Sequence, residues 1–267
     1  MRWIGWLVVP MVACTGEDVG DEGIGTDEPQ PEDTAPEVVE DRSAALSANL
    51  VDESGAPVID AGVRFCRGPV CLTAVSDGTG DFGFDNVIVG WHSLEVIPPM
   101  DSTGLATAFV PVQFATDESR TIDLTMPPLD AATALTGTAQ AIQTGAGLQI
   151  ELAEGDLEPP TFIEPATEVA GVRLTEAQHV PVDDEDGTVV AQWFLEPFDH
   201  TATVDIPMTF SNDYALADGT ELRVIVGDYT TSQWLEAGTL TVTGGELEGD
   251  VNLPVTSTVV LMDVTAN

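Results

Sequence analysis

Clustered carboxylates are the residues of this sequence best suited to chemistry. Asp183, Asp184 and Asp186 lie close together in the segment Asp183-Asp-Glu-Asp-Gly187. Calcium prefers several clustered oxygen ligands, so these three side chains form a candidate Ca²⁺ site. Their register differs from that of a calcium-binding loop, which leaves a solvated acidic turn as the alternative. No other cofactor is expected.

A second run of oxygen-bearing side chains, Asp77, Thr79 and Asp81, has the alternate spacing with which a calcium loop begins. Phe82, however, occupies the position where such a loop needs glycine. A tight turn between two strands accounts for the same residues, because Asp, Gly and Ser/Thr side chains favour turns. We therefore interpret this segment as a hairpin turn and keep calcium as the alternative.

The residue patterns of known catalytic sites do not occur in the sequence. The three histidines, His92, His179 and His200, are far apart, and there is no His-Glu-x-x-His, Gly-x-Ser-x-Gly, P-loop or glycine-rich dinucleotide turn. Carboxylate pairs are so frequent in this composition that none of them indicates acid–base catalysis. We expect His92 to face solvent from a strand, and we predict that the protein is not an enzyme.

Three tryptophans, Trp91, Trp193 and Trp234, are the side chains that would stack on a sugar ring. Each lies in a segment where apolar and polar residues alternate, as in a half-buried strand. Core packing is therefore the favoured interpretation, and sugar stacking is the alternative.

Two of the three cysteines, Cys66 and Cys71, flank the four-residue loop Arg67-Gly-Pro-Val70. A loop of this length places them directly opposite each other in an antiparallel pair, with Phe65 and Leu72 facing each other on the core side. We predict a disulfide. For so small a ring, the loss of chain entropy in the unfolded state corresponds to a stabilisation of about 2 kcal/mol. A zinc site is the alternative, but it lacks nearby histidines to complete four ligands.

The third cysteine, Cys14, follows an apolar run, Trp3 to Val12, that is preceded by Arg2. Ten residues at about 1.5 Å each do not cross a hydrocarbon core of about 30 Å, whereas they suit a secretory signal. The end of the run, Met11-Val12-Ala13-Cys14, resembles the lipobox of bacterial lipoproteins, with Met11 in place of the usual leucine. The resemblance implies that residues 1–13 are cleaved and that Cys14 is lipidated and anchors the chain to the membrane. An ordinary signal peptide is the alternative.

The charge is strongly negative. The 267 residues carry 46 acids against 7 bases, a formal net charge of −39, and every base is arginine. Such a field repels nucleic acid, which excludes a nucleic-acid partner. Residues 14–43 concentrate eleven of the acids with Gly, Pro and Thr and few large apolar side chains. This composition predicts a disordered acidic tether between the anchor and the folded part.

From residue 44 the chain has short alternating segments separated by turns. The run Val51-Asp-Glu-Ser-Gly-Ala-Pro57, the hairpin Ser76 to Phe82 and the strand Gly90-Trp-His-Ser-Leu-Glu-Val96 resemble a carboxypeptidase regulatory-like domain. The resemblance covers residues 44–128 and implies a transthyretin-like β-sandwich used as a structural or binding module. Trp91 replaces the tyrosine usual in that family.

Residues 131–267 form a second block of alternating segments. The strand around Gly147-Leu-Gln-Ile150, the acidic Pro-rich loop after it, the segment Val204-Asp-Ile-Pro207 and the hairpin Ser232-Gln-Trp-Leu-Glu236 resemble the ZU5-like β-sandwich domains of bacterial surface proteins. The expected strands include 133–142, 168–180, 233–236 and 239–242.

The predicted fold class is thus all-β, with two consecutive antiparallel β-sandwiches after the acidic linker. The predicted function is that of a lipid-anchored, exported, non-catalytic binding or structural protein of the bacterial envelope, with an unknown protein or glycan as its partner. Thr15 is not the aspartate that favours inner-membrane retention in lipoproteins, so we expect the outer membrane and the cell surface. A carbohydrate-binding accessory protein and a periplasm-facing structural subunit are the alternatives.

Overall fold

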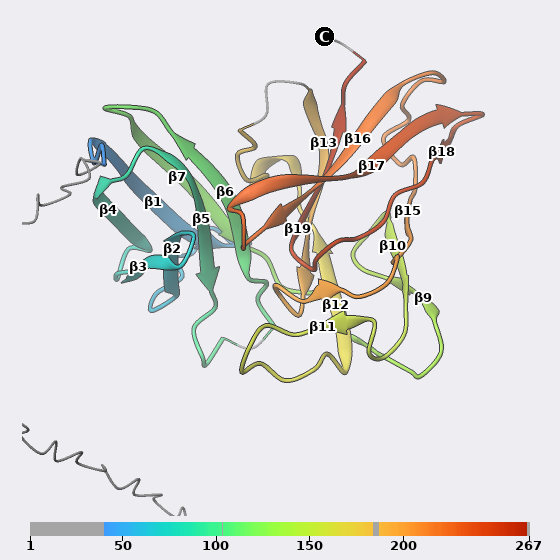
Figure 1. The fold of residues 1–267 in the computed structure, drawn as a ribbon, viewed down its shortest axis with the longest axis horizontal. Coiled ribbons are helices and arrows are strands. Elements are labelled where there is room, and N and C mark those ends of the chain that lie inside the picture. The colour runs from blue at the N-terminus through green and yellow to red at the C-terminus, as the bar shows by residue number, and fades with distance from the viewer. Residues whose placement is uncertain (1–39, 103, 184–186, 266–267) are drawn as a thin grey trace, which may run out of the picture. The chain divides into compact units, whose positions relative to one another are not determined.

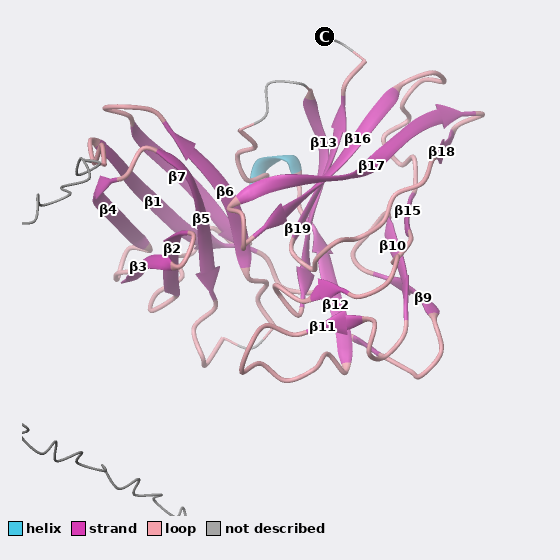
Figure 2. Ribbon diagram, in the orientation of Figure 1, coloured by secondary structure: helices cyan, strands magenta, loops and turns pink. Residues whose placement is uncertain are grey.

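The computed structural model describes residues 40–102, 104–183 and 187–265. Within them the regular secondary structure is almost entirely β-strand, and a 3₁₀ turn, η1 (Glu176–Gln178), is the helical segment (Figure 2). The all-β fold class is therefore confirmed. The predicted signal peptide, Cys14 and the tether up to residue 39 lie outside the described residues. Glu40–Asn267 forms one compact unit.

Residues 44–126 form two sheets, in the orders β4-β1-β7 and β3-β2-β5-β6 (Figure 1). Their apolar side chains recur at alternate positions, which places one face of each strand in a shared core. The sandwich was predicted to be antiparallel. One strand pair within these sheets differs, because β7 runs parallel to β1. The strands are β1 (Ala44–Asp52), β2 (Gly62–Arg67), β3 (Val70–Val75), β4 (Asp81–Val87), β5 (Gly90–Ile97), β6 (Ala108–Phe114) and β7 (Ser119–Met126).

The strands β3 and β5 of one sheet differ sharply in their exposure. β3 lies at the edge of its sheet and is exposed along most of its length. β5 lies inside the sheet and is buried on both faces from His92 to Val96. One face of β5 packs in the sandwich core, and the other lies against the second half of the chain, where Ser232 Oγ donates a hydrogen bond to Ser93 Oγ (3.3 Å).

Residues 133–263 form a seven-stranded sheet in the order β18-β17-β16-β19-β13-β12-β8, with a three-stranded sheet β15-β10-β9 and a two-stranded sheet β11-β14. Their shared core surrounds Trp193, which has no exposed surface. The strands are β8 (Thr133–Ala134), β9 (Gln140–Gln143), β10 (Leu148–Leu152), β11 (Leu157–Glu158), β12 (Glu168–Arg173), β13 (Thr188–Glu196), β14 (Thr201–Ala202), β15 (Met208–Phe210), β16 (Glu221–Asp228), β17 (Gln233–Thr243), β18 (Glu246–Glu248) and β19 (Thr258–Asp263).

Three of the expected strands have other bounds. The segment 133–142 is divided into β8 and β9, and 168–180 ends as a strand at Arg173. The two strands expected at 233–236 and 239–242 are one strand, β17, with a bulge opposite Val224 and Ile225. Glycine is required at Gly238 in this bulge, because its φ is +146° and a Cβ would lie 2.4 Å from the carbonyl oxygen of Asp250.

The two halves pack through β5 and β6 on one side and β16, β17 and β19 on the other (Figure 1). At Gly227 the backbone of β16 approaches Phe109 so closely that a Cβ would lie 2.8 Å from two ring carbons. Thr258 Oγ1 donates a hydrogen bond to the Phe109 carbonyl oxygen (2.6 Å). The core of the first sandwich also includes three buried side chains of the second half: Leu174, Val180 and Phe194.

Candidate functional site

The predicted disulfide is present between Cys66 and Cys71, with a sulfur–sulfur distance of 2.07 Å. The two cysteines face each other in the β2–β3 pair, and Phe65 faces Leu72, as predicted. Arg67 and Val70 are paired as well, so the turn between the strands has two residues and not the predicted four, and Leu72 is 43% exposed and not part of the core. The hydroxyl of Tyr229, a residue of the second half of the chain, lies 3.0 Å from Cys66 Sγ. The disulfide therefore joins the exposed edge strand β3 to β2, which contacts both halves of the chain.

The candidate calcium ligand Asp183 is already engaged by other groups. Its carboxylate accepts hydrogen bonds from the Gln113 backbone N–H (2.8 Å) and from the Arg120 guanidinium (2.5 Å). Asp184 and Asp186 lie outside the described residues. Across the part of the chain that is described, no group of three or more His, Cys, Asp or Glu side chains is arranged to hold a metal ion. Calcium binding at 183–186 remains a prediction.

The segment from Asp77 to Asp81 is a tight turn, as expected, in which the Asp77 N–H donates to the Asp81 carbonyl oxygen (2.9 Å). It does not close a hairpin, because the strands on either side, β3 and β4, belong to different sheets. Asp77 Oδ1 accepts hydrogen bonds from the Thr79 hydroxyl (2.7 Å), the Thr79 N–H (2.8 Å) and the Asp81 N–H (3.0 Å). These bonds, the Thr79 hydroxyl first, hold the pKa of Asp77 below its usual value. The same carboxylate oxygen thus satisfies the backbone of the turn, which explains the alternate spacing without a metal ion.

The expectation that His92 faces solvent is wrong. Its side chain is 4% exposed and lies parallel to the Phe65 ring, with ring centroids 4.7 Å apart. The alternation argument assumed one solvent-facing side of β5, but that side is covered by the second half of the chain and carries Ser93 and Glu95 instead. His92 therefore belongs to the face of β5 that lines the first sandwich.

The three tryptophans, which were expected to pack in the core, differ in how deeply they are buried. Trp193 is fully buried, and its Nε1 donates a hydrogen bond to the Ala146 carbonyl oxygen (2.9 Å). Trp234 is half-buried and packs against two apolar clusters. Trp91 is half-buried at the start of β5. Trp193 is thus excluded from stacking on a sugar.

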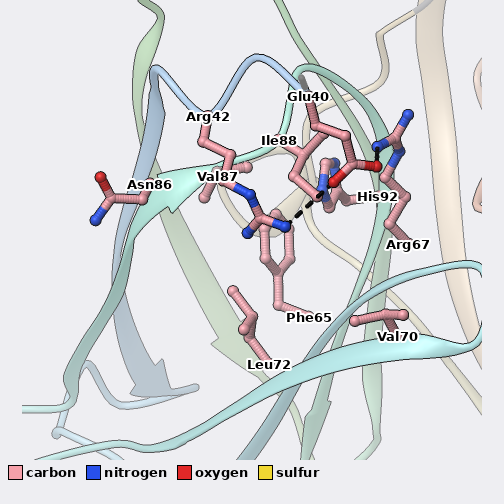
Figure 3. Close-up of a pocket in the computed structure, with 10 residues that line it drawn as sticks. All are labelled: Glu40, Arg42, Phe65, Arg67, Val70, Leu72, Asn86, Val87, Ile88 and His92. Atoms are coloured by element: carbon pink, nitrogen blue, oxygen red, sulfur yellow. Dashed lines mark hydrogen bonds and ion pairs between the residues drawn. The ribbon is translucent and has the colours of Figure 1, made fainter. Parts of the chain in front are cut away.

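A cavity of about 270 Å³ opens at the edge of the first sandwich, between the β2–β3 hairpin and the turn from β4 to β5 (Figure 3). Phe65 and His92 line its inner part, and their total exposures are only 1% and 4%. Val70 and Leu72, on the edge strand, are 65% and 43% exposed and supply an apolar rim. The cavity thus has a mainly apolar lining that ends on the side chains of the sandwich core.

Charged side chains lie across the mouth of this cavity. The Glu40 carboxylate bridges two guanidinium groups, with 3.1 Å to Arg42 and 3.2 Å to Arg67, through different oxygens (Figure 3). All three side chains remain between 42% and 58% exposed. Two positive groups therefore share one negative group at this opening.

Residues 40–43 position two of these charges, although the sequence assigned them to the tether. The Val89 N–H donates to the Asp41 carbonyl oxygen (2.9 Å), and the Thr116 hydroxyl donates to the Asp41 carboxylate (3.0 Å). The Asp117 N–H donates to Ser43 Oγ (2.7 Å). These bonds hold the segment against the turns that close β4 and β6, so that Glu40 and Arg42 lie over the cavity.

His92 acts in the cavity as a neutral ring. Burial first, and the nearby Arg67 guanidinium as well, lower its pKa, because both disfavour the charged form. Nδ1 lies 3.1 Å from the Gly90 carbonyl oxygen, which can only accept a hydrogen bond. Nδ1 therefore carries the proton, and its Nε2 is a hydrogen-bond acceptor.

No pattern in the sequence indicates this cavity directly. Its residues come from four separate segments, 40–42, 65–72, 86–88 and 92, and none of these segments carries a recognisable motif. The position of the arginines was the one available indication, because positive charges are rare in this sequence. Of its seven arginines, Arg67 lies in the disulfide hairpin and Arg42 lies at the end of the predicted acidic tether.

Two other cavities contain arginines whose charge is already balanced. Arg120 pairs with both Glu118 and Asp183. Arg173 pairs with Asp213 at 3.1 Å, and its guanidinium carbon lies 4.3 Å from the centre of the Tyr214 ring. The cavity beside Arg42 and Arg67 is the better candidate for ligand recognition, because its arginines outnumber the acids that contact them.

In the described part of the chain, no helix has the length and apolarity needed to cross a membrane. No family model matches the chain, and no curated protein matches it. The resemblances to carboxypeptidase regulatory-like and ZU5-like domains therefore remain predictions.

Solved structures with detectable similarity are remote. The TIE protein of Bacillus anthracis is 8% identical with a TM-score of 0.29, and the match covers 84% of this chain and 48% of that one. The chain thus spans about half the length of that protein. A Bacteroides uniformis protein to which carbohydrate binding has been attributed is 9% identical with a TM-score of 0.26, and the match covers 83% and 79% of the two chains. Similarity at this level assigns neither a family nor a function.

Proposed function

We propose that this chain is a lipid-anchored, exported binding protein of the bacterial envelope that carries out no chemistry of its own. The cavity between Arg42 and the β2–β3 hairpin is the observation that supports binding. It combines an apolar interior with a few convergent polar groups, which is the usual composition of ligand sites. Its lining includes no serine, threonine, cysteine or tyrosine that would act as a nucleophile.

The anchor is proposed from Cys14 and the segment before it. Lipid on Cys14 would hold the folded part at the membrane through the acidic tether, and it also accounts for the odd number of cysteines, since Cys66 and Cys71 pair with each other. We propose the outer membrane and the cell surface as the location, because Thr15 follows the modified cysteine. An unidentified protein or glycan of the envelope is the proposed partner.

Fractionation of expressing cells tests the anchor. The wild-type chain should sediment with outer membranes and dissolve only in detergent, whereas Cys14→Ala should lose the lipid that detergent extraction and mass spectrometry detect. Thr15→Asp is the matched variant, and it should keep the lipid but move to the inner-membrane fraction. A wild-type chain that carries no lipid would contradict the proposal.

Protease treatment of intact cells tests the surface location. External protease should remove the folded part while a periplasmic marker stays intact. Protection of the folded part until the outer membrane is opened would favour the periplasm-facing alternative. A glycan array tests the carbohydrate alternative, which the burial of Trp193 disfavours.

A further inference from the structure

We propose that the cavity binds a small organic anion with a flat apolar body, whose carboxylate takes the place between Arg42 and Arg67 that the Glu40 carboxylate now occupies. The inference rests on the proposed function as a binding protein and names the class of its ligand. Glu40 is then the chain's own substitute for that ligand, and binding proceeds by its displacement.

Charge balance is the first support. Arg64 forms an ion pair with Glu95, Arg173 forms one with Asp213, and Arg120 forms ion pairs with two acids. Each of these arginines is therefore balanced by at least one carboxylate that pairs with no other arginine. Among the residues that the structure describes, Arg42 and Arg67, by contrast, share the single carboxylate of Glu40. An added anion is therefore attracted to this opening even though the chain as a whole is strongly negative. Guanidinium groups bind carboxylates with good geometry, which makes a carboxylate the favoured anion.

The exposure of Glu40 makes its displacement feasible. Its side chain is 44% exposed and lies on the segment that follows the acidic tether. Ion pairs between exposed side chains contribute little to stability, because water and salt compete with them. Rotation of Glu40 into solvent would open both guanidinium groups without disturbing the core.

The apolar interior defines the body of the ligand. Phe65 and His92 lie with their planes 10° apart, and the Phe65 ring also stacks on Phe84 at 5.1 Å. Val70 and Leu72 stand exposed at the rim. A planar apolar group that enters between this rim and the rings would bury both side chains. An inorganic anion would reach the arginines but leave the apolar surface in water.

Size favours a small ligand over a chain of sugars. The cavity of about 270 Å³ lies just below the range of roughly 300–1,000 Å³ that most ligand pockets span. A single aromatic ring or a short branched chain with one carboxylate suits this space. Benzoate is therefore an appropriate probe, with benzamide as its neutral counterpart and acetate as an anion without the ring.

Isothermal titration of the whole lipidated chain in detergent with each probe tests the proposal. Benzoate should bind at least about tenfold more tightly than benzamide or acetate. The double variant Arg42→Gln/Arg67→Gln should weaken benzoate binding by about tenfold or more. Arg64→Gln is the matched control for binding, since it lies on β2 but faces away from the cavity, and it should leave benzoate binding unchanged even though the loss of its ion pair with the buried Glu95 lowers stability. A cooperative thermal transition shows that each variant is folded.

The variant Glu40→Gln tests whether the ligand displaces the Glu40 carboxylate from Arg42 and Arg67, or whether Glu40 instead holds these arginines in position for the ligand. If a ligand displaces Glu40, this variant should bind benzoate several-fold more tightly than the wild type. Weaker binding would mean that Glu40 orients the arginines, and it would overturn the displacement. Equal binding of benzoate and benzamide, or no binding of benzoate at all, would overturn the ligand class. Membrane fractionation is independent of these titrations, so the proposed lipid anchor and location would survive their failure.

Discussion

The imidazole of His92 lies parallel to the phenyl ring of Phe65, with centroids 4.7 Å apart and planes separated by 10°. The two residues come from adjacent strands, β5 and β2, and both belong to buried surface of the first sandwich. The proposed ligand surface is therefore also part of the core. A substitution at this position should affect stability as well as binding, and the two effects must be measured separately.

Replacement of His92 by phenylalanine should preserve the stack and remove a titratable group. Burial lowers the pKa of His92 in the folded state, so the unfolded chain takes up the proton first as the pH falls below about 6.5. The wild type should therefore lose stability on acidification relative to His92→Phe. Urea unfolding of both proteins between about pH 5 and pH 8 measures the difference. A difference that stays constant with pH would show that His92 is not buried as described.

Asp199 should produce a pH dependence of the opposite sign. Burial first, and then the neighbouring carboxylates of Asp228 and Glu95, raise the pKa of Asp199 to about 6. The folded state therefore holds this proton more firmly than the unfolded state, and the resulting stability is lost as the pH rises through about 6. Asp199→Asn should be stabilised relative to the wild type at neutral pH and not below about pH 4.

A matched control for Asp199 exists at Asp60. Both residues have a φ of +61°, a conformation that asparagine tolerates, but Asp60 is exposed. Asp60→Asn should leave the pH dependence of urea unfolding as it is in the wild type. If both substitutions changed the profile equally, the effect would come from net charge and not from the burial of Asp199.

The strands of the first half could be predicted from the sequence because each has a clear local signal. Alternation marks β7, and the four-residue loop between Cys66 and Cys71 fixes the register of β2 and β3. The bounds of β17 were missed, since a bulge at Gly238 lets the strand continue where the sequence indicated a break. Local patterns do not distinguish a glycine that ends a strand from one that accommodates a close approach of another backbone.

The burial of His92 follows from strand alternation, because His92 lies on the same face of β5 as the buried Leu94 and Val96. The cavity beside it was beyond sequence-based prediction, because its lining comes from segments that are distant in the sequence. The positions of Glu40 and Arg42 depend on hydrogen bonds to Val89 and Thr116, which are distant in sequence. Composition predicts a tether over residues 14–43, but it does not reveal that residues 40–43 pack against the first sandwich.

The contact between Gly227 and Phe109 predicts a strong effect of adding one methyl group. In Gly227→Ala the new Cβ would lie 2.8 Å from the Phe109 ring, and overpacking of this kind typically costs about 1–3 kcal/mol. Gly62→Ala is the matched control, because it is also a strand glycine and its nearest contact would be at an ordinary 3.8 Å. Urea unfolding should show a loss for the first variant and none for the second. Equal stability of the two would mean that the halves do not pack as described.

Removal of the disulfide should destabilise the hairpin that forms one wall of the cavity. The bond closes a short ring, with a sequence separation of 5, for which chain entropy predicts a contribution of about 2 kcal/mol. The double variant Cys66→Ala/Cys71→Ala should lose roughly this much free energy of unfolding. It should also bind benzoate more weakly than the wild type, because Val70 and Leu72 are held at the rim by β3. Intact binding with reduced stability would show that the wall is positioned by strand pairing alone.

The proposed site is tested most directly by nuclear magnetic resonance of the arginine side chains during titration with benzoate. The sequence holds only seven arginines and no lysine, so each guanidinium signal can be assigned by single substitutions. We predict that the Arg42 and Arg67 signals shift together and saturate, while those of Arg64, Arg120 and Arg173 stay in place. Shifts spread over all the arginines, or centred on Arg120 or Arg173, would contradict it.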